Sequence, residues 1–125
     1  MKPLVLIADD DPDVRLLFRM SLQRNGFDVM EAADGSEALD CAFHSTPALI
    51  LLDAMMPYVD GVEVCRQLKA DSRTASIPVI FVSAKVNLSS YLEKLDLPVA
   101  GCLTKPVSLR NLMQSVNAVV SAEVH

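Results

Sequence analysis

The feature that most constrains the fold of this chain is a regular alternation between short apolar runs and segments of helical period. The runs have the length of ordinary strands, and three of them are apolar at almost every position. Such strands need cover on both faces of their sheet. We therefore expect five strands, at residues 4–8, 28–32, 48–52, 78–82 and 101–104.

The segments between these strands carry apolar residues at helical spacing together with helix-capping residues. Asp11 and Pro12 suit the start of the first helix, and Gly26 suits its end. Asp34 and Glu37 resemble a capping box at the start of the second helix. Further helical patterns lie within residues 62–68, 87–95 and 109–120, and the one at 87–95 is the weakest.

Strands that alternate with helices in this way predict an α/β fold. The expected form is a doubly wound parallel sheet with right-handed crossovers and helices on both faces, a three-layer sandwich. A length of 125 residues predicts one domain, residues 1–125. Ligands of such sheets bind beyond the carboxyl ends of the strands. The residues that directly follow each strand are therefore the candidates for a functional site.

Composition excludes several classes of partner. A net charge of −5 argues against a direct nucleic-acid surface, which normally has a basic patch. No apolar run is long enough to span a membrane, and three early aspartates exclude a signal peptide. Cys41, Cys65 and Cys102 are odd in number and form no CxxC pair, so we expect reduced thiols and a cytoplasmic location.

Polar residues follow four of the predicted strands. Asp9 and Asp10 follow the first, Asp53 the third, Ser83 the fourth and Lys105 the fifth. In a parallel sheet these side chains would converge on one crevice. Taken singly, the lysine could be an ordinary surface residue and the serine a helix cap.

Clustered carboxylates repel one another unless a cation is present. Mg2+ binds one or two carboxylates, keeps several waters and often uses phosphate oxygens, which predicts a magnesium site at Asp9, Asp10 and Asp53. Helix capping is the alternative reading for the acids. It suits Asp11, but it does not explain why Asp53 ends a different strand.

These residue types together suit phosphoryl transfer. A carboxylate can attack phosphorus and carry the phosphoryl group as an acyl phosphate, while a metal and a lysine neutralise the charge. Asp53 is the best nucleophile because it stands alone at its strand end. Neither GxxxxGK[ST] nor GxSxG occurs, which argues against a P-loop nucleotide site and a serine hydrolase.

Four motifs in order, LIADDDP, LLDAMMPYVDG, FVSAK and CLTKP, resemble those of a response-regulator receiver domain of two-component signalling. The resemblance is to chemotaxis-like receivers and covers essentially the whole chain. Ser83 lies 30 residues after Asp53, and Lys105 lies 22 residues after Ser83. The resemblance implies a flavodoxin-like (βα)5 fold with a five-stranded parallel sheet in the order 2-1-3-4-5.

The resemblance also implies the metal site in detail. Asp53 would be the phosphoacceptor and a metal ligand, Asp10 would bind Mg2+ directly, and Asp9 would bind it through water. The backbone carbonyl of Met55 would complete the protein ligands. Pro57 and Gly61 would set the turn that directs this carbonyl to the metal.

Further implications concern the phosphoryl group and the partners. Ser83 and Lys105 would bind the phosphoryl group, and the Lys105–Pro106 peptide bond would be cis. The donor would be a phosphohistidine of a histidine kinase or histidine phosphotransfer protein, and the receiver of the signal an output domain or downstream protein. Such a switch is not an enzyme in the usual sense, and the resemblance also allows a homodimer through the fourth and fifth helices.

Two positions depart from the family pattern. Receivers usually carry an aromatic switch residue three positions before the lysine, where this chain has Cys102, and Val107 replaces a frequent phenylalanine. The signal would then pass through loop ordering or helix repacking. We expect partner contact around Tyr91, Leu95 and Cys102, although Leu95 suits a core position equally well.

Two alternatives remain at the level of the sequence. The missing aromatic residue is compatible with a degenerate receiver that acts as a phosphorylation-independent interaction module. A phosphohydrolase of the haloacid-dehalogenase type also uses an aspartyl nucleophile, but it places DxDx[TV] after its first strand, where this chain has DDDPD.

Overall fold

The computed structural model describes residues 2–124, with side chains described as far as Ser121. Five parallel strands form one sheet in the order β2-β1-β3-β4-β5, which confirms the predicted topology. The strands are β1 Leu4–Ala8, β2 Asp28–Ala32, β3 Leu49–Leu52, β4 Val79–Ser83 and β5 Gly101–Thr104. The helices are α1 Pro12–Arg24, α2 Gly35–Ser45, α3 Gly61–Ala70, α4 Leu88–Lys94 and α5 Leu109–Val124.

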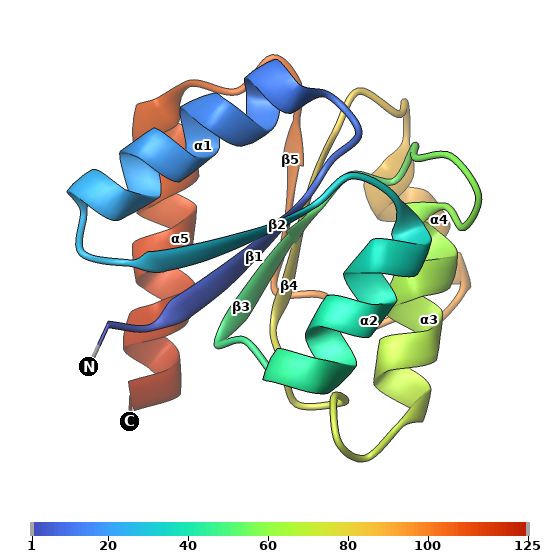
Figure 1. Cartoon of the computed structure of the whole chain (residues 1–125). Coiled ribbons are helices and arrows are strands. Elements are labelled where there is room, and N and C mark those ends of the chain that lie inside the picture. Colours follow the sequence, from blue (N-terminus) through green and yellow to red (C-terminus); the bar gives the residue numbers. More distant parts are fainter. Residues whose placement is uncertain (1, 125) are drawn as a thin grey trace.

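The sheet is the middle of three layers. Helices α1 and α5 cover one face, and α2, α3 and α4 cover the other (Figure 1). Successive side chains of a strand point to opposite faces, so Leu6 and Ile50 enter one core while Val5 and Leu49 enter the other. Burial on both faces is the physical reason for the nearly continuous apolar runs.

The helix starts follow the capping residues of the sequence. The side chain of Asp11 accepts a hydrogen bond from the backbone N–H of Asp13, and Pro12 is the first helical residue of α1. The Asp34 carboxylate accepts one from the N–H of Glu37 at 2.8 Å, as the capping-box pattern predicts. Both helices therefore begin where local chemistry satisfies their first N–H groups.

Helix α4 is the short one, as its weak pattern indicated. It has 7 residues and begins after Asn87, which has a φ of 59° and makes no side-chain capping bond. Leu88 and Leu92 are its buried residues and attach it to the core. Among the described residues, no helix has the length and apolar character that a membrane crossing requires.

In the loop from Asp53 to α3, the residue with left-handed backbone is Tyr58, with a φ of 69°, directly after Pro57. Gly61 is the first residue of α3, and a Cβ atom there would lie 1.9 Å from the carbonyl oxygen of Asp53. Gly61 is therefore required for a close approach between the helix and the backbone of Asp53.

Candidate functional site

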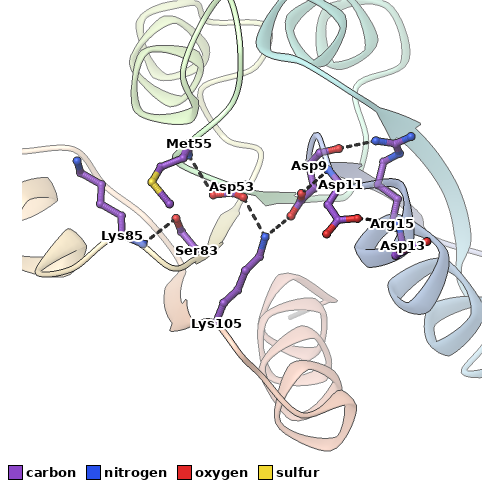
Figure 2. A network of polar contacts seen from close by, with 9 residues as sticks. All are labelled: Asp9, Asp11, Asp13, Arg15, Asp53, Met55, Ser83, Lys85 and Lys105. Carbon is purple, nitrogen blue, oxygen red and sulfur yellow. Dashed lines mark hydrogen bonds and ion pairs between the residues drawn. The ribbon is translucent and has the colours of Figure 1, made fainter.

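The carboxyl edge of the sheet collects the polar residues that the sequence placed at the strand ends. Asp9 follows β1, Asp53 follows β3, Ser83 is the last residue of β4 and Lys105 follows β5 (Figure 2). The predicted convergence is confirmed for the side chains of Asp9, Asp53 and Lys105, which meet through hydrogen bonds, while Ser83 lies at the same edge of the parallel sheet.

Lys105 joins two of the strand ends. Its ammonium nitrogen lies 2.6 Å from Asp9 Oδ2 and 2.9 Å from Asp53 Oδ2 (Figure 2). The Lys105 side chain is 22% exposed, whereas the two carboxylate side chains are 4% and 6% exposed. Removal of Lys105 would leave the buried carboxylates of Asp9 and Asp53 without a compensating charge. The contacts among these three side chains are therefore costly to break. The Lys105–Pro106 peptide bond next to it is cis, as predicted.

The acidic residues form a cluster that could hold a metal ion. One carboxylate oxygen from each of Asp9, Asp10 and Asp53 lies within 4.8 Å of the others. Asp10 is exposed, while Asp9 and Asp53 are buried. A donor set made only of oxygens suits a hard divalent cation such as Mg2+, and the exposed side leaves room for waters.

Backbone donors fix the orientation of both buried carboxylates. Asp9 Oδ1 accepts a hydrogen bond from the N–H of Asp11 at 2.9 Å. Asp53 Oδ1 accepts one from the N–H of Met55 at 3.0 Å. In each residue the other oxygen, Oδ2, faces the ammonium group of Lys105, so both carboxylates are held in one rotamer. The role of the Met55 carbonyl as a metal ligand stays a prediction.

The pKa shifts follow from burial and from the lysine. Burial raises the pKa of Asp9 above its ordinary value, and the hydrogen bond from Lys105 opposes this shift without cancelling it. Burial lowers the pKa of Lys105, but its hydrogen bonds to Asp9 and Asp53 raise it further, so the net shift is upward. The lysine therefore stays protonated, while the charge of Asp9 is costly until more positive charge is added.

Ser83 lies at the same edge but in a different environment. It is 1% exposed, and its hydroxyl oxygen accepts a hydrogen bond from the N–H of Lys85 at 3.2 Å. The ammonium group of Lys85 lies 5.6 Å from the ring centroid of Tyr91 on α4. Ser83 is thus linked to the loop before α4 and, through Lys85, to the surface of that helix.

Cys102 lies on β5, where the family pattern has its aromatic residue. It is half-buried and lines a hollow of about 290 Å³ beneath the loop from β4 to α4, together with Ser83. Tyr91 and Leu95 are 45% and 47% exposed, so the core position considered for Leu95 is wrong. These two residues and Met55 line a separate groove of about 440 Å³ between α3 and α4.

Arg15 is a site residue that the sequence analysis missed. Its Nη1 donates a hydrogen bond to the backbone carbonyl of Asp9 at 2.7 Å (Figure 2). Its Nε donates to Glu31 on β2 at 3.1 Å. A main-chain acceptor has no residue-type signature, and the pairing with Glu31 becomes visible only when the packing of α1 against β2 is known.

Comparison with known proteins agrees with this geometry. The family model described as the response regulator receiver domain matches residues 5–117. Two curated relatives are the DNA-binding dual master transcriptional regulator RpaA of Synechocystis, with 37% identity over 94% of this chain, and the response regulator MprA of a Mycobacterium species, with 39% identity over 93%. The chain covers only 49% and 50% of their lengths, about half of each protein.

Solved structures give the same result. The receiver domain of the Francisella response regulator 1452 matches with a TM-score of 0.87 and 33% identity, over 98% of this chain and 99% of that one. The Vibrio cholerae chemotaxis protein CheY4 matches with a TM-score of 0.86 and 27% identity, over 95% and 99%. This chain belongs to the receiver-domain family of two-component response regulators.

Proposed function

We propose that this chain is a phosphoacceptor switch. A phosphoryl group is transferred in a Mg2+-dependent step from a phosphohistidine to Asp53, and the product has a changed affinity for an output partner or domain. The observation that carries the proposal is the position of Asp53, which is 5% exposed, bonded to Lys105 and grouped with Asp9 and Asp10. A buried carboxylate with this surrounding charge suits an acyl-phosphate intermediate.

In the proposed transfer, a carboxylate oxygen of Asp53 forms a bond to phosphorus while the P–N bond to the donor imidazole breaks. The imidazole keeps the electron pair of that bond and takes up a proton. Asp9, Asp10, Asp53 and the carbonyl of Met55 would hold Mg2+, which when bound neutralises negative charge on the phosphoryl oxygens. The protein itself contributes mainly position and charge.

Ser83 and Lys105 would bind the transferred group. Lys105 is already at the Asp53 carboxylate and can follow the new charge with one of its three N–H donors. The Ser83 hydroxyl accepts from Lys85 and retains its own proton for donation to a phosphoryl oxygen. Such a donation moves Ser83 towards Asp53 and alters the loop before α4.

The proposed output runs through this loop and α4, because Cys102 offers no ring that could rotate. The exposed Tyr91 and Leu95 of this region form the proposed contact surface. A phosphorylation-independent interaction module is the second candidate, and the observation that favours it is the same Cys102. We propose neither direct nucleic-acid binding nor catalytic turnover for this chain. The DNA binding named for RpaA is a property of that relative.

The proposed partners are a histidine kinase or histidine phosphotransfer protein as donor and an output domain or downstream protein as target. A homodimer through α4 and α5 is compatible with this scheme. A cytoplasmic location is proposed because all three cysteines are free thiols, which a reducing compartment maintains.

The test is the intact mass of the protein after incubation with a small-molecule phosphodonor and Mg2+. The wild type should gain one phosphoryl group, and the gain should disappear in Asp53→Asn or when EDTA replaces Mg2+. Circular dichroism controls for the fold of the variant, and a phosphomonoester assay checks for hydrolase turnover. Wild-type protein that binds Mg2+ but gains no mass would sink the phosphotransfer proposal and favour the interaction module.

A further inference from the structure

Arg15 approaches the acidic loop from the side opposite Lys105. Figure 2 shows Asp9 between the two cations, with its carboxylate towards Lys105 and its backbone carbonyl towards Arg15. The Arg15 Nη1 lies 2.7 Å from that carbonyl oxygen. A hydrogen bond from a charged donor is stronger than one between neutral groups, so this contact can restrain the loop.

The carbonyl that Arg15 binds belongs to the peptide unit between Asp9 and Asp10. Because a peptide unit is planar, fixing its carbonyl also fixes the plane that contains the Cα atoms of Asp9 and Asp10, which leaves a single backbone torsion between this plane and each side chain. The N–H of Asp9 donates to the carbonyl of Ala32 on β2 at 3.1 Å. Both backbone groups of Asp9 are therefore held, one by β2 and the other by Arg15.

Arg15 is itself held in place. Its Nε donates to Glu31 Oε1 at 3.1 Å, and Arg19 Nη1 donates to Glu31 Oε2 at 2.6 Å. The Arg15 side chain is only 17% exposed and that of Glu31 is 26% exposed, whereas that of Arg19 is 39% exposed. Glu31 on β2 thus orients the guanidinium group, and the guanidinium group orients the loop.

We propose that Arg15 is a positioning residue for the metal site. It holds the Asp9–Asp10 peptide in the orientation that directs both carboxylates to one cation, and it contacts neither the metal nor the phosphoryl group. This inference rests on the proposed function, because the metal site belongs to it. Arg19 provides a matched contrast, since it binds the same glutamate but makes no bond to the loop.

The test is a calorimetric titration of the full chain with MgCl2 alone. Arg15→Met should weaken Mg2+ binding about ten-fold, the lower end of the effect found when a support of a metal ligand is removed. Arg19→Met should stay within about two-fold of the wild type, because loop support is retained. Arg15→Lys should have an intermediate Mg2+ affinity, because an ammonium group replaces only part of the hydrogen bonding of the planar guanidinium group.

A second readout separates positioning from stability. The rate of phosphorylation by a small-molecule phosphodonor should reach the wild-type value in Arg15→Met once Mg2+ is saturating, because Asp53 and Lys105 are intact. Melting temperatures of all variants are measured in parallel. Equal losses of melting temperature in Arg15→Met and Arg19→Met, with wild-type Mg2+ affinity in both, would overturn the inference.

The two proposals fail in different ways. Wild-type protein that binds Mg2+ but accepts no phosphoryl group overturns the phosphotransfer proposal, while the titrations still measure the effect of Arg15. Should Arg15→Met not fold, Arg15→Lys takes its place: weaker Mg2+ binding in that folded variant supports the positioning role, and unchanged binding contradicts it.

Discussion

The two halves of the site differ in how firmly they are held. The acidic half consists of Asp9, Asp10, Asp53 and Lys105. Two ion pairs of 2.6 and 2.9 Å join its residues, and backbone N–H groups donate hydrogen bonds to both buried carboxylates. The hydroxyl half consists of Ser83 and the loop to α4. Its hydroxyl accepts one 3.2 Å hydrogen bond, and the helix that follows has 7 residues.

The difference indicates that the two halves have different roles. Many mutually supporting contacts keep the acidic half in one geometry before any ligand arrives. A short helix without a side-chain cap has lower local stability, and such segments are where a bound group can shift a conformational equilibrium. In the proposed function the acidic half receives the phosphoryl group, and the hydroxyl half responds to it.

The largest expected effect is a difference in alkylation rate between the thiols of Cys65 and Cys102. Cys65 lies on α3, is fully buried and has a pKa raised to about 11 by burial. Cys102 is half-buried and lines the hollow under the loop of the hydroxyl half. At pH 8 iodoacetamide should label Cys65 roughly 100-fold more slowly than Cys102, because both thiolate fraction and access are lower.

Peptide mapping of the alkylated protein at timed intervals measures both rates, and urea-unfolded protein is the control in which the difference should largely vanish. Phosphorylation of Asp53 should change the Cys102 rate and leave the Cys65 rate constant. Equal labelling of Cys65 and Cys102 in the folded protein would contradict the looser packing assigned to the hollow of the hydroxyl half relative to the buried core.

The second effect is the loss of the lysine that holds the acidic half together. Lys105→Met leaves Asp9 and Asp53 buried without their cation, which should lower the free energy of unfolding by about 2 kcal/mol in EDTA. The loss stays below that of a fully buried pair because Asp9, whose pKa burial already raises, can take up a proton. Urea unfolding with EDTA and again with Mg2+ measures it.

Added Mg2+ should recover part of this loss, because it supplies positive charge at the same carboxylates. Lys94→Met on the exposed surface of α4 is the matched control and should change the free energy of unfolding by less than about 0.5 kcal/mol. A Lys105→Met protein as stable as this control in EDTA would show that the acidic half does not depend on its lysine.

The smallest effect lies in the loop of the hydroxyl half. Asn87 has a φ of 59°, where most L-residues are strained, and asparagine tolerates this region better than alanine. Asn87→Ala should therefore cost about 1 kcal/mol in the free energy of unfolding, whereas Asn87→Gly should be close to neutral. Thermal melts of both variants suffice, and an alanine variant at least as stable as the glycine variant would contradict the assigned backbone conformation.

The sequence predicted the elements and the meeting of Asp9, Asp53 and Lys105 because these depend on simple rules. Apolar runs of five residues between helical patterns leave few arrangements other than a covered parallel sheet, and parallel strands bring their ends together. The strand order came from the resemblance and is confirmed. The roles of the site residues in metal binding and phosphoryl transfer stay predictions.

Contacts to the main chain were beyond the sequence. Arg15 acts on a backbone carbonyl, and Glu31, 16 residues later, becomes its partner only through the packing of α1 against β2. The close approach at Gly61 was hidden from the sequence for a related reason. A glycine indicates either positive φ or close approach, and only the packing of α3 against the Asp53 carbonyl shows that Gly61 serves the second.

The ion pair between Asp9 and Lys105 spans 96 residues of sequence, and this span has a consequence for protein synthesis. At typical translation speeds Lys105 is made about 5–20 s after Asp9. During that interval a nascent chain holds the acidic residues without the lysine that pairs them. A protein that accepts the phosphoryl group in the proposed way has therefore already added its fifth strand, so a nascent chain that stops short of Lys105 could not take part in the transfer.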